Sequence, residues 1–214
     1  MWITQLAIYY TLSYNGASNL TAPAAMQGQF WLYTSFMSEK VAVFIDGGNL
    51  YRLLKQHKIL PQKRFDYSGL VDFVLRGREL VSKGYYVGIV RNHDNTESSQ
   101  RMVDGQQKFL SNLEKQNFHI ERGRIVYDHD IREKGVDVKI AVDIVAGAFE
   151  NKYDTAVVFS SDTDLLPAIK QVIAMGKKVE YVGFSTRPSI GMTKECSLTI
   201  LLLQEDIERI SKEK

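Results

Sequence analysis

The sequence predicts an α/β protein, a three-layer α/β/α sandwich around a mainly parallel sheet of about five to six strands. From Lys40 onward, short apolar runs alternate with longer segments whose apolar residues recur every three or four positions. The runs are continuously apolar, as in residues 41–45, which is typical of parallel strands that are buried on both faces. The 214 residues, 44% of them hydrophobic, suit one domain that can bury a core without a disulfide or a metal ion.

The first half of this region is expected to supply three strands and the helices between them. Apolar runs mark the strands, and amphipathic spacing marks the helices. Gly47 and Gly48 interrupt the pattern after the first strand, before a helix begins. In chain order we expect strand 41–45, helix 50–56, a basic linker at 61–64, helix 70–80, strand 85–90, helix 100–116 and strand 118–127.

The second half continues the alternation of helices and strands. Val136, Ile140, Ile144 and Ala148 are spaced as one face of a helix. Gly176 is expected to end the helix that follows the fourth strand. In chain order we expect helix 136–148, strand 155–159, helix 165–175, strand 178–184, a short strand 198–203 and a closing helix 206–210.

The first 36 residues differ in composition from the rest, because they contain no Lys, Arg, Asp or Glu. Without a basic start they do not fit a secretory signal, and the apolar run 6–12 is shorter than the roughly 20 residues that span a bilayer. We therefore expect residues 1–36 to be an N-terminal extension outside the core fold, and residues 37–214 to form the domain. An anchor or signal, or aromatic side chains packing onto the domain, remains the alternative.

Charge and cysteine content limit the classes of function and compartment. The chain has 27 basic and 25 acidic side chains, a net charge of +2, which is too balanced to indicate a nucleic-acid partner by itself. Phosphate binding would need local clusters of charge or metal ions. The single cysteine, Cys196, cannot form an internal disulfide, so we expect a reducing, cytoplasmic location.

Acidic residues follow two of the predicted strands. Asp46 comes directly after the first strand, and Asp162 and Asp164 come directly after the fourth. Because binding sites in parallel sheets form at the carboxyl ends of the strands, we expect these carboxylates to meet at one edge. A carboxylate at the end of a buried strand is costly unless it is paired, hydrogen-bonded or bound to a metal ion. This convergence is the main functional signal in the sequence.

Each of these motifs also has a purely structural interpretation. Gly47, Gly48 and Asn49 would serve as a turn with Asn49 capping the next helix, although the glycines would also leave room for a phosphate or metal ion. Asp162 and Asp164 would cap a helix and offset its dipole, but one acid suffices for that purpose.

Helix 136–148 carries two further acids, with different expected roles. Asp137 lies in the first turn, where acids are common. Asp143 is six residues later, about 240° around the helix, so the two side chains point in different directions. Lys139 is four residues before Asp143 and is suited to an ion pair with it. The spacing therefore predicts a structural Asp143.

Clustered carboxylates repel one another, and a hard divalent cation removes that conflict. Mg²⁺ and Mn²⁺ prefer oxygen ligands and can activate a water for attack on a phosphodiester. The four histidines are scattered, with no His/Cys spacing suited to zinc. We therefore expect Mg²⁺ or Mn²⁺ as the cofactor.

Three ordered motifs resemble the NYN domain family, a branch of the PIN-like nucleases, and its LabA-like group. They are Phe44-Ile-Asp-Gly-Gly-Asn-Leu50, Lys134-Gly-Val-Asp-Val-Lys-Ile-Ala-Val-Asp143 and Ser160-Ser-Asp-Thr-Asp-Leu165. The resemblance implies catalytic and metal-binding roles for Asp46, Asp137, Asp162 and Asp164. It also matches Asp143 to a family acid, so Asp143 is kept with Asn49 and Ser161 as a residue that orients ligands or substrate. Family members often have Gly at the position of Ser161 and an Ala-Asp pair where Gln204-Glu205-Asp206 stands.

Basic residues near the acidic edge are candidates for RNA binding. Arg91 follows the second strand, Arg187 follows the fifth, and Lys134 and Lys139 flank Asp137. Other candidates for a positive rim are Tyr51, Arg52, Arg122 and Arg124.

The sequence favours a metal-dependent ribonuclease that acts on single-stranded RNA, with no membrane partner and with a homodimer left open. The alternative is a non-catalytic RNA-binding or regulatory module that retains the acidic pocket. A phosphatase with an aspartyl intermediate ranks last, because Gly48 stands where it needs a second Asp. A dinucleotide site is excluded, since no Gly-x-Gly-x-x-Gly follows the first strand.

Overall fold

The computed structural model describes residues 38–57, 65–127 and 131–211. The fold belongs to the compact unit Glu39–Lys214. The extension expected at 1–36 and the basic linker expected at 61–64 lie outside the described residues. Among the helices described, none has the length and apolar character needed to cross a membrane.

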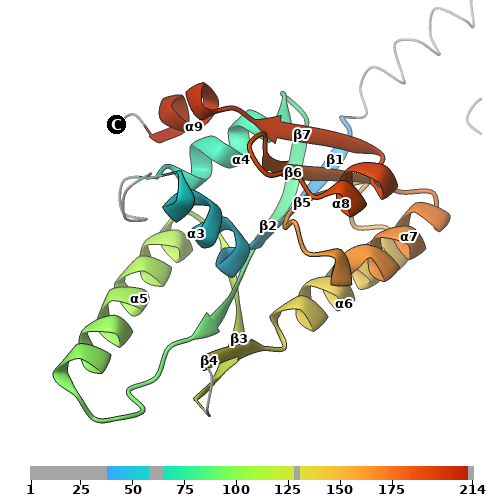
Figure 1. The fold of residues 1–214 in the computed structure, drawn as a ribbon. Coiled ribbons are helices and arrows are strands. Elements are labelled where there is room, and N and C mark those ends of the chain that lie inside the picture. The colour runs from blue at the N-terminus through green and yellow to red at the C-terminus, as the bar shows by residue number, and fades with distance from the viewer. Residues whose placement is uncertain (1–37, 58–64, 128–130, 212–214) are drawn as a thin grey trace, which may run out of the picture. The chain divides into compact units, whose positions relative to one another are not determined.

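The described part of this unit is built on one seven-stranded sheet in the order β4-β3-β2-β1-β5-β6-β7 (Figure 1). Neighbouring strands are parallel except for β4, which pairs antiparallel with β3 at the edge. The central strand β1 lies between β2 and β5, so the two strand ends that carry acids are adjacent. The strands are β1 Lys40–Asp46, β2 Glu79–Ile89, β3 His119–Tyr127, β4 Ile131–Lys134, β5 Thr155–Phe159, β6 Lys178–Phe184 and β7 Leu198–Leu202.

Helices cover both faces of the sheet. One face carries α3 Gly47–Gln56, α4 Tyr67–Leu75, α5 Glu97–Lys115 and α9 Gln204–Ser211 (Figure 1). The other carries α6 Val136–Phe149, α7 Leu166–Ala174 and α8 Ile190–Glu195, with the short 3₁₀ helix η2 Thr163–Leu165 before α7. Each face has its own hydrophobic core, which confirms the predicted three-layer sandwich with a mainly parallel sheet.

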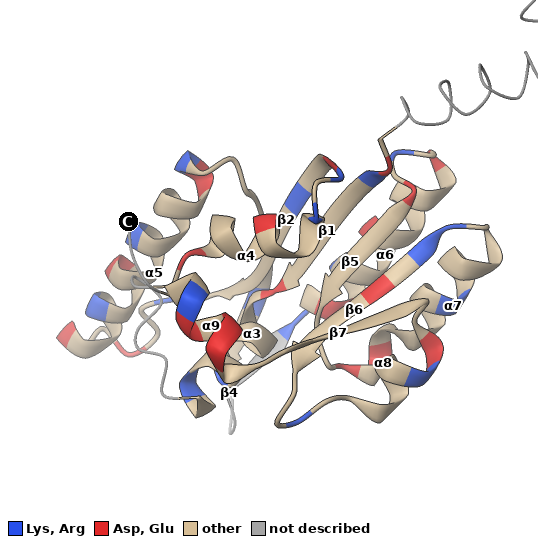
Figure 2. Ribbon diagram, turned by 90° about the horizontal axis from the view of Figure 1, so that it is seen from above, with Lys and Arg blue, Asp and Glu red and all other residues tan. Residues whose placement is uncertain are grey.

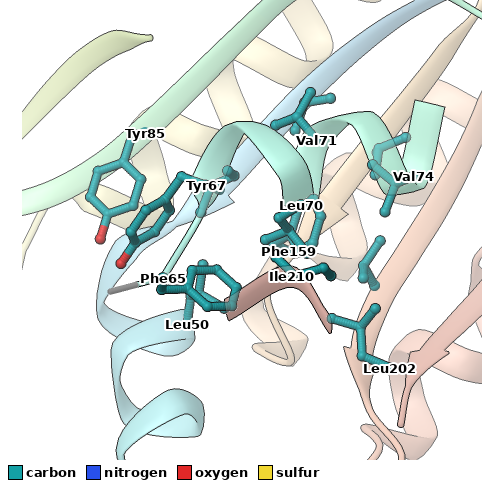
Figure 3. Close-up of a cluster of buried hydrophobic side chains, with 14 of the residues drawn as sticks. Leu50, Phe65, Tyr67, Leu70, Val71, Val74, Tyr85, Phe159, Leu202 and Ile210 are labelled. Atoms are coloured by element: carbon teal, nitrogen blue, oxygen red, sulfur yellow. The ribbon is translucent and has the colours of Figure 1, made fainter. Parts of the chain in front are cut away.

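Aromatic rings pack tightly in the core beneath α3 and α4 (Figure 3). Tyr67 lies edge-on to Phe65 and Tyr85, with ring centroids 5.1 and 5.7 Å apart. The Tyr85 ring also fills the space beside Gly47, where an added Cβ would be 2.6 Å from ring carbons. The absence of a side chain at Gly47 is therefore explained by packing, and the space expected there for a phosphate or metal ion is occupied.

The core beneath α6 contains the helix face that the spacing predicted. Val136, Ile140, Ile144 and Ala148 are all buried against the sheet. The Tyr153 hydroxyl, just before β5, donates a hydrogen bond to the Ile144 carbonyl. These contacts fix α6 against the sheet and so determine where its first turn lies.

Three local predictions differ from the structure. The helix expected at 70–80 ends at Leu75, because Arg76 and Gly77 adopt positive φ angles of 51° and 79° that terminate a helix. Leu80 therefore belongs to β2. Neither the four-residue strand β4 nor the six-residue helix α8 was expected, since segments this short carry little periodicity.

Candidate functional site

Asp46 ends β1 and caps α3, and it is only 5% exposed. Its Oδ1 accepts a 2.9 Å hydrogen bond from the Asn49 backbone N–H, and its Oδ2 accepts a 2.8 Å bond from the Ser160 hydroxyl. The structural interpretation in which Asn49 caps the helix is wrong, because α3 begins at Gly47 and Asn49 lies within its first turn. The capping residue is Asp46 itself, and both of its oxygens are held in fixed directions.

The segment after β5 is joined to the segment after β1 by its two serines. The buried Ser160 hydroxyl, besides donating to Asp46, accepts a 3.2 Å hydrogen bond from the Asp162 backbone N–H. The Ser161 hydroxyl donates a 3.0 Å bond to Asn49 Oδ1. Asp162 Oδ1 in turn accepts a 2.9 Å bond from the Asp164 backbone N–H. This network fixes the late acids relative to Asp46, at the one edge of the sheet where the sequence predicted them.

Asp137 reaches the same site from the first turn of α6. The helix follows Gly135, which has a φ of 83° that glycine adopts readily. Partial burial raises the pKa of Asp137, and the negative charges of Asp46, Asp162 and Asp164 raise it further. The charges of the other three acids thus all act on the carboxyl of Asp137. We call this group of four, Asp46, Asp137, Asp162 and Asp164, the acid cluster.

Burial raises the pKa of Asp46 above its ordinary value, and the charge of Asp162 adds to this effect. The hydrogen bonds from Asn49 and Ser160, together with the positive charge of Arg52, act in the opposite direction. Arg52 lies on α3 and also lowers the pKa of Asp137. The carboxylates thus repel one another, and a cation at this position would be favoured.

The chemistry of the acid cluster fits a hard divalent cation, but the cluster is not a compact chelate. In the described ranges, no three His, Cys, Asp or Glu side chains converge closely enough to hold a metal ion directly. Mg²⁺ is commonly held by one or two carboxylates while it keeps several waters. The oxygen donors of this site therefore suit a hydrated cation, with the remaining acids acting through water.

Asp143 is directed toward a different part of the sheet. It accepts hydrogen bonds from the Tyr86 hydroxyl at 2.9 Å and from Lys139 Nζ at 2.6 Å. Lys139 also pairs with Glu121 of β3 at 3.5 Å. The ion pair predicted from the i,i+4 spacing is present. Lys139 is thus neutralised by two protein carboxylates rather than left available to RNA.

Two further basic candidates, Arg91 and Lys134, come from different parts of the sheet. Arg91 follows β2 and is exposed, with its backbone N–H donating to the Tyr127 hydroxyl at 2.9 Å. Lys134 is the last residue of β4 and is also exposed. Residues of both charge signs are spread along α5 and α9 (Figure 2). A positive surface for RNA must therefore be sought locally, as the balanced net charge predicted.

A pocket of about 310 Å³ lies beside the acid cluster. Arg187, predicted from the sequence, and Arg52, noted there as a residue of the rim, line it together. We call it the arginine pocket, and its lining residues are Asn49, Arg52, Leu53, Gln56, Ser161, Arg187, Pro188 and Ser189. The pocket was not predicted, because it depends on packing between α3 and the segment that connects β6 to α8. The only signal in the sequence was an arginine in each of these two segments.

Comparisons with known proteins identify one family and find solved structures with a similar fold. Residues 40–202 match the model of the NYN domain. A protein of unknown function from Vibrio parahaemolyticus has a similar crystal structure, with a TM-score of 0.58 and 20% sequence identity over 77% of this chain and 93% of that chain. At this identity the likeness concerns the fold alone. No curated protein matches the chain.

Proposed function

The chain belongs to the NYN domain family of PIN-like nucleases, and we propose that it is a metal-dependent ribonuclease of the LabA-like group. The observation that carries the proposal is the hydrogen bond from Ser160 to Asp46, which unites the acids after β5 with the acid after β1. Asp137 adds a fourth carboxylate from α6. We further propose that the protein works in the cytoplasm, where the free Cys196 would stay reduced.

We assign the cation, Mg²⁺ or Mn²⁺, mainly to Asp46 and Asp162, with Asp137 and Asp164 acting through water. When bound, such an ion lowers the pKa of a water and stabilises the departing oxygen of a phosphodiester. Asp46 would contribute a carboxylate whose orientation is fixed before binding, because Ser160 and Asn49 hold its two oxygens. This preorganisation reduces the cost of ordering the site around the ion.

Exposed acids and a neighbouring arginine support single-stranded RNA as the substrate. Asp137 and Asp164 are exposed, so a single strand can approach them from solvent. Arg52 is close enough to lower the pKa of two members of the acid cluster, and its charge would offset their repulsion of a phosphate. A single strand is the substrate we favour, because the basic residues are local rather than spread over a broad surface.

The test is cleavage of a labelled single-stranded RNA by the purified full chain with Mn²⁺, Mg²⁺ or EDTA. Cleavage is expected only with a divalent cation, and Asp46→Asn and Asp162→Asn should each reduce the rate about a hundredfold or more. Asp104→Asn is the matched control, because Asp104 is an exposed acid on α5 that accepts a hydrogen bond from Gln100. Equal cleavage by both site variants and wild type would exclude the assigned mechanism. The same strand as DNA tests the choice of RNA.

A second function, a non-catalytic RNA-binding module, is favoured by one observation. No three potential ligand side chains converge within the part of the chain that the structure describes. This alternative expects RNA to bind without turnover at any divalent-cation concentration. Binding by Asp46→Asn equal to wild type, with no cleavage by either protein, would select it.

A further inference from the structure

The arginine pocket is formed by two segments that are far apart in the sequence. Arg52, Leu53 and Gln56 come from α3, and Arg187 and Pro188 come from the loop after β6. Its volume of about 310 Å³ is at the lower end of the range for small-molecule sites. It can hold a phosphate with part of a nucleotide, but it is too small for a duplex.

The two arginines of the pocket are available to an external anion. Arg52 and Arg187 are exposed, and across the described ranges neither forms an ion pair with a carboxylate. Arg78 provides a contrast, because both of its terminal nitrogens bind Glu180 at 2.8 Å. Guanidinium groups that lack a protein partner are suited to bidentate contacts with phosphate oxygens.

The pocket is continuous with the acid cluster. Asn49 and Ser161 line the pocket, and both belong to the hydrogen-bond network that holds Asp46 and Asp162. The Asn49 side-chain oxygen accepts from Ser161, and among the described residues no hydrogen bond occupies its NH₂ group, which can therefore donate to a ligand. A group bound in the pocket would therefore lie directly beside the proposed cleavage site.

We propose that the arginine pocket binds the terminal phosphomonoester of an RNA strand and places the neighbouring phosphodiester bonds over the acid cluster. The proposal rests on the nuclease function proposed above and adds a class of substrate to it. A phosphomonoester carries a charge of about −1.5 to −2 at pH 7, whereas an internal phosphodiester carries a single negative charge. Two arginines that form no ion pair within the described part of the chain match the doubly charged end of the strand better than its interior.

The test is binding of one short single-stranded RNA prepared with a 5′-phosphate, with a 3′-phosphate, or with hydroxyl groups at both ends. Fluorescence anisotropy with the full chain in EDTA measures affinity without cleavage, and repulsion by the acid cluster is common to all three RNAs. One phosphorylated form is expected to bind about tenfold more tightly, and the preferred form identifies which end enters the pocket. Equal affinities for the three RNAs would overturn the proposal.

Variants of the two arginines test whether the preference for a phosphorylated RNA end comes from the arginine pocket. Arg187→Gln and Arg52→Gln should each abolish the preference for a phosphorylated end. Lys55→Gln should retain it, because Lys55 is an exposed cation on α3 that does not line the pocket. A preference that survives in both arginine variants would contradict the assignment. Thermal melts establish that each variant is folded.

Cleavage of the same three RNAs with Mn²⁺ separates this proposal from the nuclease proposal. Cleavage of all three at equal rates, together with equal affinities, would retain the nuclease and overturn the terminal-phosphate pocket. A preference for one phosphorylated end without cleavage of any RNA would support the pocket and overturn the nuclease. Cleavage that is faster for the preferred end supports both.

Discussion

The Ser160 hydroxyl donates a 2.8 Å hydrogen bond to Oδ2 of Asp46, although the two residues are 114 positions apart in the sequence. The bond joins the ends of β5 and β1, which are paired as neighbours in the sheet. Ser160 also accepts from the backbone N–H of Asp162. One buried hydroxyl therefore sets the position of two acids that we assign to the metal site.

Ser160→Ala should lower both the free energy of unfolding and the rate of RNA cleavage. The change leaves an oxygen of the buried Asp46 without its donor and the Asp162 N–H without its acceptor, which should cost about 1–3 kcal/mol in the free energy of unfolding. It should also lower the cleavage rate about tenfold, because Asp46 and Asp162 lose their common support.

Ser68→Ala is the control for this effect. The Ser68 hydroxyl donates a bond of the same 2.8 Å length to Gln116, away from the acid cluster. Its loss should reduce stability slightly and leave cleavage unchanged. Urea unfolding and initial cleavage rates measure the two quantities. If both variants lost cleavage equally, the effect of Ser160→Ala on cleavage would come from the loss of fold stability and not from the acid cluster.

Asp46→Asn should stabilise the protein when no divalent cation is present. Burial and the charge of Asp162 both raise the pKa of Asp46, so its ionised form is unfavourable in the folded state. Removing that charge while keeping the shape should raise the free energy of unfolding by about 1 kcal/mol, as is common when a functional site is relaxed. Urea unfolding in EDTA at neutral pH is the measurement. A destabilised variant would show that the carboxylate is held mainly for structure.

Mn²⁺ should stabilise the wild-type protein if, as we propose, the cation binds the folded acid cluster and not the unfolded chain. At a cation concentration one hundred times its dissociation constant, the gain is about 2.7 kcal/mol. Thermal melts with increasing Mn²⁺ should show this rise in wild type and in Asp104→Asn, and only a small rise in Asp162→Asn. An equal shift in all three proteins would indicate cation binding elsewhere.

Gly47→Ala should destabilise the fold through the core and not through the metal site. The added Cβ would lie 2.6 Å from the buried Tyr85 ring, and overpacking of this kind costs about 1–3 kcal/mol. Gly105→Ala is the matched control on α5, where a Cβ meets nothing within 4 Å. That change should stabilise the protein by about 0.5–1 kcal/mol. Losses of similar size in the two variants would contradict the packing explanation.

Glu39 should contribute stability at neutral pH that disappears in acid. The Thr155 hydroxyl donates to Glu39 at 2.6 Å, and this bond, with Lys178 and Arg78 nearby, lowers the pKa of the carboxyl below its ordinary value of 4.5. The contribution is therefore complete above pH 4.5 and is lost as the pH falls through the lower pKa of the folded state.

Glu39→Gln should cost about 1 kcal/mol at pH 7, and the difference from wild type should narrow below pH 4.5. Glu97→Gln is the control, because Glu97 forms an exposed pair with Arg101 on α5 that should contribute little. Urea unfolding over a range of pH measures both variants. A difference that stays constant into acid would show that the hydrogen bond does not depend on the charge of Glu39.

The sequence was informative where a single local pattern decides the structure. The apolar run before Asp46 and the run before Ser160 predicted two buried strands, and the rule on strand ends then placed their acids at one edge of the sheet. The helical spacing of Val136, Ile140 and Ile144 likewise predicted the buried face of α6. These predictions needed no knowledge of side-chain packing.

Other features depend on contacts between distant segments and were not predictable in this way. Leu80 fits either a helix or a strand by its spacing, and the positive φ of Arg76 decided the outcome. Gly47, at the start of α3, is required by the ring of Tyr85, which lies on β2. The arginine pocket exists only because folding brings the loop that holds Arg187 to the side of α3.

Cleavage of one labelled single-stranded RNA by wild type and by Asp46→Asn, with and without Mn²⁺, tests the central claim most directly. The acid cluster predicts cleavage by wild type with Mn²⁺, none in EDTA, and a loss of about a hundredfold or more in the variant. Cleavage by folded Asp46→Asn at the wild-type rate, or wild-type cleavage that persists in EDTA, would contradict the assignment of this site.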